Sequence, residues 1–278
     1  MSVVSQPEGT GVGPGAEGVS PPAPRHPFTL ALDIGGTGLK ASVLDAGGAM
    51  VADRVRVPTT YPLPPETFLD LVQRLVAPLP KAERVSVGFP GMVRDGLVLS
   101  APHFSTKHGP GSPTDPDLAR RWWRFPLAES LAAAFGLPTK VANDADIQGA
   151  AVVSGRGLEL VITLGTGFGT GLFYQGQLMP HLEIAHQPFR KGETYNEQVG
   201  EATRKEIGDT RWNKRVHKAI ANLRALMFFD HLFVGGGNSR RVARHDLPDD
   251  VTIVDNTAGI LGGIKLWESD HVGVNAPA

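Results

Sequence analysis

A glycine-rich turn between two short apolar segments occurs twice in this chain, and this repeat constrains the fold more than any other feature. The first copy spans residues 29–45 and turns at Gly35, Gly36 and Gly38, and the second spans residues 160–174 with four glycines in its turn. Apolar segments of this length on either side of a glycine turn are typical of a β-hairpin. Because the two copies lie about 130 residues apart, we expect a duplicated chain in which a hairpin opens each half.

Strand signals alternate with helix signals between and after the hairpins. Apolar residues at helical spacing predict helices over Pro65–Val76 and residues 126–135, 144–154 and 212–227, with a partly helical segment at 257–267. Short apolar runs predict strands over Arg84–Phe89, residues 139–142 and residues 231–234. Such alternation is typical of the α/β class, in which helices cover a mostly parallel sheet.

The composition is that of an ordinary globular protein and excludes several classes of function. The chain has 278 residues, 41% of them hydrophobic and 20% charged, enough for one large domain or two of modest size. With 27 basic and 28 acidic side chains the formal net charge is −1, so no global field attracts nucleic acid or an anionic membrane. The absence of cysteine excludes disulfides, thiolate metal sites and cysteine nucleophiles. No apolar run reaches the roughly 18 residues that a membrane-spanning helix needs, so we expect a cytoplasmic protein.

The ends of the chain differ in composition from its centre. Residues 1–27 are rich in Gly, Pro, Ser and Ala and nearly lack large apolar side chains, so we predict a disordered tail. Gly13, Gly15 and Gly18 match the spacing of a dinucleotide-binding turn, but no strand precedes them, and we interpret the match as coincidence. Elsewhere we expect an N-terminal α/β domain over residues 28–141, a C-terminal α/β domain over 142–268 whose last helix could pack back on the first, and a disordered tail over 269–278.

Glycine turns that follow strands suit the binding of phosphate groups, because a backbone without Cβ atoms lets N–H groups converge on an anion. A third turn, formed by Gly235, Gly236 and Gly237, follows the strand predicted for residues 231–234. A single glycine hairpin is more often structural, so the prediction of a phosphate clamp depends on the three turns together. The P-loop motif and the protein-kinase signatures are absent from the sequence.

Three carboxylates near predicted strand ends could take part in phosphoryl transfer to a hydroxyl. This reaction needs a base near the acceptor and a cation beside the donor phosphates. Asp33 lies within the first hairpin, and Asp144 and Asp146 follow the strand predicted for residues 139–142. The alternatives are structural, because an Asp often begins a turn and either member of the pair could cap the next helix. A capped helix does not need both.

Glu183 and His186 form a short polar motif after the second hairpin. Their spacing would fit a metal site on a helix, but there is no second such pair, and the flanking Pro180 and Pro188 indicate a loop. A loop that hydrogen-bonds a polyol is the better functional interpretation, and a salt-linked surface loop is the alternative.

A basic stripe accompanies the helix predicted for residues 212–227. Its members are Arg211, Lys214, Arg215 and Lys218, and the further cations Arg240, Arg241 and Arg244 follow the third glycine turn. Such a stripe is usually a solvated face, and the functional alternative is a track for a chain of phosphates.

Seven of these segments, in this order, resemble the ROK family of sugar kinases. They are residues 32–40, 88–91, 143–146 and 164–169, Glu183 with His186, and residues 235–237 and 256–259. Within that family the polyphosphate glucokinases are the most similar group, and the likeness covers about residues 29–268. The resemblance implies a two-domain actin-like fold of the hexokinase type, ribonuclease H-like in each half, with an interdomain cleft for sugar and phosphate.

The resemblance also implies roles for individual residues on the acceptor side. It makes Asp144 the base that deprotonates the 6-hydroxyl of the sugar. The sugar would be bound by Asn143, Glu183 and His186 in a pocket shaped by Pro90 and Gly91. A second sugar-binding Glu is expected downstream, where Glu193 and Glu197 are both candidates and Glu197 is the one retained.

On the donor side, the resemblance implies that the phosphoryl donor and its Mg²⁺ ion lie between the glycine turns. Asp33 would hold the ion, directly or through water. The donor-binding set comprises Asp33, Gly35, Gly36, Thr37, Lys40, Gly165, Thr166, Gly167, Gly169, Gly235, Gly236 and Gly237.

The sequence also departs from the family pattern. The cysteine-rich zinc motif after the sugar-binding histidine is absent, as in polyphosphate glucokinases, so no zinc is expected. Ala185 stands where a Gly is usual, and residues 100–107 lack a common Asn, which leaves the exact hexose open. Repressors of the family carry an N-terminal helix-turn-helix that residues 1–27 do not resemble, so no nucleic-acid partner is expected.

The leading hypothesis is a phosphotransferase that converts glucose to glucose 6-phosphate with inorganic polyphosphate, ATP or both. The alternatives are an ATP-dependent kinase for another hexose, a non-catalytic regulator that binds sugar or phosphate, and a filament-forming actin-like protein. The presence of Asp144 favours turnover over the regulator, and Glu183 and His186 argue against the filament protein. No membrane partner is expected, and a homodimer is the oligomer that the resemblance suggests.

Overall fold

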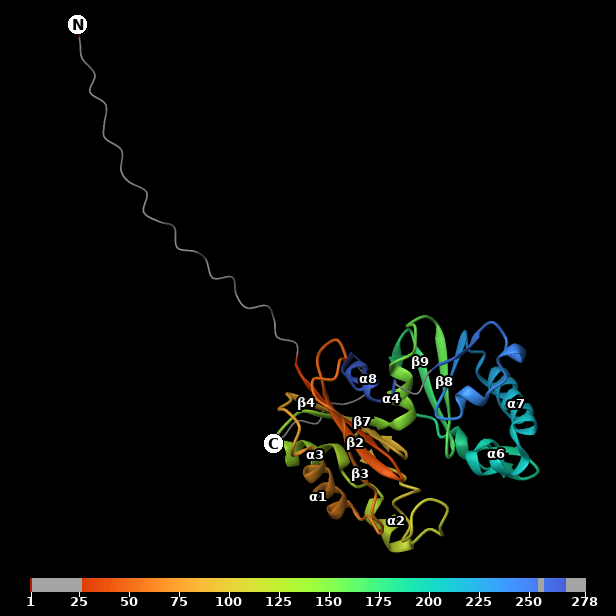
Figure 1. Cartoon of the computed structure of the whole chain (residues 1–278), viewed down its shortest axis with the longest axis horizontal. Helices are drawn as coiled ribbons and strands as arrows, with labels where there is room; N and C mark the ends of the chain where they lie inside the picture. The colour runs from red at the N-terminus through yellow and green to blue at the C-terminus, as the bar shows by residue number, and fades with distance from the viewer. Residues whose placement is uncertain (2–26, 255–257, 269–278) are drawn as a thin grey trace.

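The computed structural model of the full chain contains two five-stranded sheets with helices packed around them (Figure 1), which confirms the α/β class. The structure describes Met1, residues 27–254 and residues 258–268. The two predicted disordered tails therefore lie outside the described residues, apart from Met1 and residue 27. Within the described ranges, no helix combines the length and the apolar character needed to cross a membrane.

The first sheet has the strand order β3-β2-β1-β4-β7. Its strands are β1 (Thr29–Ile34), β2 (Gly38–Leu44), β3 (Val55–Pro58), β4 (Arg84–Phe89) and β7 (Thr139–Asn143). The predicted glycine turn joins β1 to β2 in an antiparallel hairpin, whereas β1, β4 and β7 are parallel neighbours. Parallel strands end at the same edge of a sheet, so Asp33 near the end of β1 and Asn143 at the end of β7 share one edge.

The second sheet repeats this topology with the order β10-β9-β8-β13-β14. Its strands are β8 (Leu158–Leu164), β9 (Phe168–Tyr174), β10 (Gln177–Leu178), β13 (His231–Gly235) and β14 (Val251–Ile253). In both sheets a hairpin is followed by a third antiparallel strand, and two parallel strands extend the other side. This identity of strand order and direction confirms the predicted duplication.

The connections contain eight α-helices and two short two-stranded sheets among the described residues. The helices are α1 (Pro65–Val76), α2 (Pro116–Trp122), α3 (Leu127–Phe135), α4 (Asp144–Ala150), α5 (Tyr195–Val199), α6 (Glu201–Ile207), α7 (Asp209–Met227) and α8 (Ala258–Lys265). The short sheets pair β5 (Val93–Arg94) with β6 (Leu97–Val98) and β11 (Pro188–Arg190) with β12 (Glu193–Thr194). Four 3₁₀ turns complete the described elements: Ile184–His186, Ser239–Arg241, Arg244–Asp246 and Leu266–Glu268.

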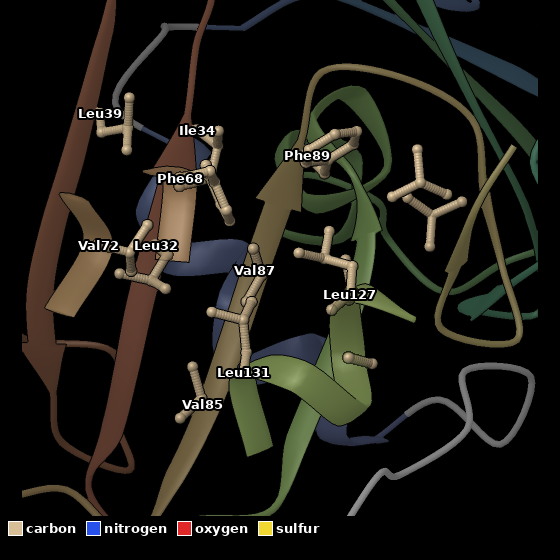
Figure 2. Close-up of a cluster of buried hydrophobic side chains, with 14 of the residues drawn as sticks. Leu32, Ile34, Leu39, Phe68, Val72, Val85, Val87, Phe89, Leu127 and Leu131 are labelled. Atoms are coloured by element: carbon tan, nitrogen blue, oxygen red, sulfur yellow. The ribbon is translucent and has the colours of Figure 1, made fainter. Parts of the chain in front are cut away.

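The core of the first half forms where α1 and α3 pack on the sheet. Figure 2 shows side chains of β1 and β4, such as Leu32 and Val87, beside Phe68 of α1 and Leu131 of α3. Helix α1 begins with a proline, whose fixed φ suits the first helical position, and it buries Phe68, Val72 and Leu75 on one face. Each such side chain contributes roughly 1.5–3 kcal/mol when it is removed from water. This packing gives the glycine turn after β1 a rigid base.

The core of the second half is built on α7. Trp212, Val216, Ile220 and Leu223 recur at helical spacing and are buried against β8 and β13 side chains such as Leu160 and Val234. The indole N–H of Trp212 donates to the carbonyl oxygen of Val199 at 2.7 Å, which joins α7 to the end of α5. The predicted start at residue 212 was late by three residues, because the polar first turn carries no apolar signal.

Helix α8 returns from the second half of the chain and packs against α4 and β1 (Figure 1). At Gly262 a Cβ atom would overlap the carbonyl oxygen of Ile147 in α4, so only glycine permits this contact. The hydroxyl of Ser86 in β4 donates to the carbonyl oxygen of Gly263 at 2.6 Å. The glycines of the predicted helix therefore serve close packing between α8 and the first sheet.

Helix α4 ends at Ala150, whereas the sequence predicted a helix to about residue 154. The chain leaves the helix here because the buried carboxylate of Glu159 accepts hydrogen bonds from the backbone N–H groups of Ser154, Gly155 and Arg156. These bonds fix residues 154–156 as a loop, which apolar spacing alone does not reveal.

Candidate active site

A cleft of about 1370 Å³ is lined by residues of both sheets. Its wall contains the glycine turns that end β1, β8 and β13, the start of α4 and the loop that carries Glu183. The predicted site residues on this wall are Asp33, Gly35, Gly36, Thr37, Lys40, Pro90, Gly91, Asn143, Asp144, Gly165, Thr166, Gly167, Gly169, Glu183, His186, Gly236 and Gly237. The structure therefore brings most of the predicted site together around a single space.

The turn between β1 and β2 is held by hydrogen bonds from outside the hairpin. The hydroxyl of Tyr61 donates to the carbonyl oxygen of Gly36 at 2.6 Å, and that of Thr59 donates to Gly35 at 2.7 Å. Asp33 pairs with Lys40 across the hairpin, with 2.7 Å between Oδ2 and Nζ. The turn is thus fixed by its carbonyl groups and presents one carboxylate and one ammonium group at the cleft.

The turn between β8 and β9 is held in place by contacts with α5 and α6. The side-chain oxygen of Asn196 accepts from the backbone N–H of Phe168 at 3.0 Å, and a Cβ atom at Gly167 would overlap it. The N–H of Glu201 donates to the carbonyl oxygens of Gly165 and Thr166 at 3.1 and 3.3 Å. The two glycine hairpins therefore face one cleft as rigid backbone turns, which is the arrangement expected for binding an anion.

The third glycine turn packs directly on the second. Gly236 has φ of 86°, and a Cβ atom there would approach the backbone of Leu164 within 2.6 Å, so glycine is required. The side chain of Asn238 donates to a carboxylate oxygen of Glu201 at 2.6 Å. Hydrogen bonds from Arg204, Asn238 and Lys205 lower the pKa of Glu201 to about 2, so this carboxylate is charged and anchors the turn.

The start of α4 places Asn143 and Asp144 at the cleft. Asn143 caps the helix, with Oδ1 accepting from the N–H of Ala145 at 2.8 Å, and its Nδ2 donates to the carbonyl oxygen of Gly91 at 3.0 Å. The Asn143 cap leaves Asp144 available for another role, although one oxygen of Asp144 also accepts from Ala145 at 2.9 Å. At Gly91 a Cβ atom would overlap the carbonyl oxygen of Ser100, so the pocket wall there has no room for a larger residue.

Asp144 has an unusual environment for a carboxylic acid. Burial and the nearby charge of Asp33 raise its pKa to about 7. The carboxyl group is partly exposed and lines the cleft, so a ligand can reach it. A carboxylate with a pKa close to neutrality is suited to accept a proton from a hydroxyl group.

The loop after β10 carries Glu183 and His186, which flank the buried residues Ile184 and Ala185. Glu183 is partly buried and His186 is exposed, and both line the cleft. His181, which was not among the predicted site residues, lies on the same wall between Asp146 and Glu183. Burial opposes ionisation of Glu183, but the charges of His181 and His186 lower its pKa below the ordinary value.

Two predicted binding residues lie away from the cleft wall. Gly235 is the buried last residue of β13, behind the turn that reaches the cleft. Glu197 forms a capping box, in which its carboxylate accepts from the backbone and hydroxyl of Thr194 at 2.8 Å while the Thr194 hydroxyl accepts from the Glu197 N–H. These backbone and side-chain hydrogen bonds lower the pKa of Glu197. Its structural role is therefore visible, and its role with sugar stays a prediction.

The basic stripe of α7 is outside the cleft wall and is not uniform. Arg211, Lys214 and Lys218 are exposed, and Nζ of Lys218 lies 5.8 Å from the ring centre of Phe189. Arg215 is partly buried and donates to the carbonyl oxygen of Gln198 at 3.2 Å. Arg240, from the turn after β13, does line the cleft.

Several wall residues were not among the predicted site residues. They are Ile34, Met50, Asp53, Arg54, Pro102, His103, Gln148, Thr163, Phe168, His181, Ala185, Asn196, Ser239 and Arg240. Those from irregular loops, such as Asp53, Arg54, His103 and His181, have no periodic pattern that could have selected them.

Among the described residues, no group of three or more His, Asp or Glu side chains is arranged to hold a metal ion. Mg²⁺ does not need such a group, because it keeps several water ligands and commonly binds through one or two carboxylates and the phosphates of a substrate. Asp33, which pairs with Lys40 through Oδ2 and lines the cleft, supplies the kind of hard oxygen ligand that this ion prefers. The residues present therefore fit a magnesium ion that arrives with a phosphate donor.

Comparison with known proteins supplies the family. The family model described as "ROK family" matches residues 29–183, more than half of the chain and the part that holds both hairpins. The chain belongs to the ROK family.

Two relatives differ in how much of the chain they match. The polyphosphate glucokinase of Mycobacterium tuberculosis (strain CDC 1551 / Oshkosh) is 26% identical over 263 residues, which are 88% of this chain and 92% of the relative. The N-acetylmannosamine kinase of Escherichia coli O157:H7 is 35% identical over 158 residues, which are 54% of this chain and 49% of the relative.

A solved structure extends the likeness to the fold. The inorganic polyphosphate/ATP-glucomannokinase from Arthrobacter sp. strain KM has a TM-score of 0.72 and 28% identity, over 87% of this chain and 99% of that one. The ROK chain therefore has the actin-like two-domain fold that its sequence implied, and it is a sugar kinase in the broad sense of its relatives.

Proposed function

We propose that this ROK protein phosphorylates glucose at its 6-hydroxyl, with inorganic polyphosphate, ATP or both as the phosphoryl donor. The observation that carries the proposal is Asp144, a carboxyl group with a pKa of about 7 that lines the same cleft as the glycine turns that can bind phosphate. The names of the relatives with whole-chain similarity, a polyphosphate glucokinase and a polyphosphate/ATP glucomannokinase, agree with this proposal.

In the proposed reaction Asp144 acts as the general base. Its carboxylate takes the proton of the sugar hydroxyl while that oxygen forms a bond to phosphorus and the bond from phosphorus to the leaving phosphate oxygen breaks. The proton is then held on the Asp144 carboxyl group, which is feasible because its pKa is about 7. Bound Mg²⁺, held by Asp33 directly or through water, would neutralise charge on the donor phosphates.

The acceptor would be bound between the start of α4 and the loop after β10. Asn143 and Glu183 present hydrogen-bonding groups from the two sides, and Pro90 and Gly91 form a close wall. His186 is exposed and also lines the cleft. A hydroxyl group placed among them would lie beside Asp144, which is what transfer to a sugar requires.

The donor would lie along the glycine turns and leave the cleft past Arg240. Beyond it, the amide group of Asn213 in α7 donates to the carbonyl oxygen of Arg241 at 3.0 Å, so the basic helix adjoins the turn that carries Arg240. A polyphosphate chain would gain from cations outside the cleft, whereas ATP needs only the cleft itself. We therefore propose polyphosphate as a donor alongside ATP.

The test is glucose 6-phosphate formation by the purified protein with Mg²⁺, comparing ATP with long-chain polyphosphate at equal phosphoryl concentration. Asp144→Asn should reduce turnover by about a hundredfold or more, because the base is lost, while calorimetry still detects glucose binding. Asp249→Asn, at an exposed position outside the cleft, is the matched control and should retain full activity. Near-normal turnover by Asp144→Asn would remove Asp144 as the base.

A second candidate function is an ATP-dependent kinase for another hexose, favoured by the 35% identity to an N-acetylmannosamine kinase over part of the chain. An acceptor panel of glucose, mannose and N-acetylmannosamine decides between the two. Sugar binding without turnover on any acceptor or donor would instead favour a regulator. A homodimer remains part of the proposal, and light scattering tests it.

A further inference from the structure

His181 links helix α4 to the loop that carries Glu183. Its Nδ1 atom lies 2.9 Å from Oδ2 of Asp146, and its Nε2 atom lies 3.7 Å from Oε2 of Glu183. The side chains of His181 and Asp146 are only 5% and 3% exposed, whereas that of Glu183 is 26% exposed on the cleft wall. The three residues form a chain, hereafter the Asp146–His181–Glu183 chain, that runs from the protein interior to the cleft.

The central ring of this chain is an imidazolium. One carboxylate faces each ring nitrogen, and both nitrogens must carry a proton to donate in both directions. Burial lowers the pKa of His181, but the hydrogen bond with Asp146 and the charges of Asp146 and Glu183 outweigh it and raise the pKa to about 10. Asp144 and His186 are the other ionisable groups whose charges reach members of the chain.

Two polar atoms of the chain have no hydrogen-bond partner in the part of the protein that the structure describes. Oδ1 of Asp146 and Nε2 of His181 are buried without a hydrogen-bond partner among the described residues. The 3.7 Å gap to Glu183 is longer than a hydrogen bond. A buried ion pair adds little to stability relative to apolar packing, and unsatisfied buried polar atoms reduce it. The arrangement is therefore poorly explained as core packing and better explained by the group at its open end.

We propose that His181 is a positioning residue for the acceptor: anchored by Asp146, it orients the carboxylate of Glu183 toward a hydroxyl group bound in the cleft. The inference rests on the proposed function, in which Glu183 binds the acceptor. Asp146 lies two residues after Asp144 on α4, so the chain ties the acceptor-binding loop to the helix that carries the base. When a hydroxyl group binds, a small movement of Glu183 would close the gap to His181 and complete the chain.

The first test separates the two substrates kinetically. His181→Asn keeps a short donor for Asp146 but removes the cation beside Glu183. It should lower kcat/KM for glucose roughly tenfold to a hundredfold, as expected when a substrate-binding group is misplaced by about 1 Å, while the donor KM changes less than about twofold. The control is His217→Asn on α7, another histidine with a buried unpartnered Nε2, which should leave the glucose parameters unchanged. Unchanged glucose parameters in His181→Asn would overturn the inference.

The second test asks whether His181 and Asp146 act as one unit. Asp146→Asn should also weaken the use of glucose, and the double variant should be about as impaired as His181→Asn alone, because interacting residues are not additive. If the losses in kcat/KM of the two single variants multiply in the double variant, the two residues act separately, and the anchoring part of the inference would be wrong.

The third test does not depend on turnover. In ligand-free protein with ¹⁵N-labelled histidine, NMR should show both ring nitrogens of His181 protonated at pH 8, and Asp146→Asn or Glu183→Gln should move its titration downward. A neutral His181 at pH 8 overturns the inference. If the wild type forms no glucose 6-phosphate, the proposed function fails separately, and calorimetry with the sugar that does bind then decides whether His181→Asn weakens acceptor binding.

Discussion

At the scale of single residues, the site depends on what surrounds Asp144. Asn143 supplies the helix cap, so Asp144 can keep an oxygen for the cleft while remaining in the first turn of α4. Asp33 and Asp146 raise its pKa further, and the imidazolium of His181 opposes them. A base that titrates near neutrality is thus produced by burial and by neighbouring charges rather than by one special contact.

The raised pKa of Asp144 predicts the pH dependence of the reaction. The base must be ionised, so kcat should fall as the pH drops through about 7, about three units above the ordinary value of 3.8. The measurement is kcat from pH 5 to 9 with both substrates saturating. Asp144→Glu should displace the midpoint of the kcat profile, because it moves the carboxyl group. A midpoint that does not change in this variant belongs to the donor phosphates. A wild-type midpoint near pH 4 would contradict the raised pKa of Asp144.

The raised pKa of Asp144 also predicts that this residue lowers the free energy of unfolding above neutral pH. A carboxyl group whose folded pKa is raised favours the folded state while it is protonated, and this contribution is lost as the pH rises from about 4 through 7. Three units correspond to roughly 4 kcal/mol, which partial exposure reduces to about 1–3 kcal/mol. Asp144→Asn should therefore raise the unfolding midpoint relative to wild type at pH 8, with little difference at pH 4. An equal shift at both pH values would contradict the pKa.

At the scale of elements, the glycine turns and their flanking strands could be predicted because their signals are local. Helix α1 was predicted with its observed bounds, since Pro65 marks its start and Phe68, Val72 and Leu75 mark its buried face. Helix α6 buries none of its side chains and starts at a glycine cap, so its sequence lacks the apolar spacing that would predict a helix. Helix α5 had a signal, the capping box of Thr194 and Glu197, but that Glu was interpreted as a sugar ligand.

His181 shows why part of the candidate site could not be predicted. Nothing in its local sequence separates it from a surface histidine, and its partner Asp146 lies 35 residues away. The pairing arises only because β8, β9 and β10 fold the following loop back onto α4. Site residues from loops, such as Arg54 and His103, depend on tertiary structure in the same way.

The contact between α8 and α4 makes a prediction at this scale. Gly262→Ala places a methyl group against the backbone carbonyl of Ile147, which no side-chain rotation relieves, so the helices must move apart. We expect a loss of about 1–3 kcal/mol or more, seen as a fall in Tm of about 2–4 °C per kcal/mol. The control is Gly47→Ala, whose Cβ would meet only a side-chain oxygen of Asp45 at 3.4 Å. Equal Tm values for the two variants would contradict the packing argument.

At the scale of the whole molecule, the two halves have the same topology but contribute different groups to the cleft. The first sheet supplies Asp33, Lys40 and, at its last strand, Asn143 and the start of α4. The second supplies the other two glycine turns and the loop of Glu183. Helix α8 crosses back to the first sheet, so a relative movement of the halves must be accommodated at its contact with α4. Closure of such a cleft would exclude water from the transferred phosphoryl group.

The charge distribution over the whole molecule determines how a long polyanion can be bound. The net charge is −1, so a long polyanion gains no general attraction and must be bound by local cations. Arg211, Lys214 and Lys218 are exposed, but Lys218 lies over the ring of Phe189, and Arg215 is engaged with Gln198. Arg211→Glu/Lys214→Glu should raise the KM for long-chain polyphosphate about tenfold, equivalent to about 1.4 kcal/mol, and change the KM for ATP less than about twofold.

The matched control is Lys81→Glu/Arg94→Glu, which changes the net charge equally at two exposed positions outside the cleft wall. If the stripe binds polyphosphate, only Arg211→Glu/Lys214→Glu raises the KM for polyphosphate. This increase becomes smaller as the salt concentration rises, because exposed charges are screened. It should also shrink as the polyphosphate is shortened, since a chain that ends within the cleft never reaches α7. Equal effects of the two pairs would assign the stripe to ordinary solvation, and the donor would then be selected by the cleft alone.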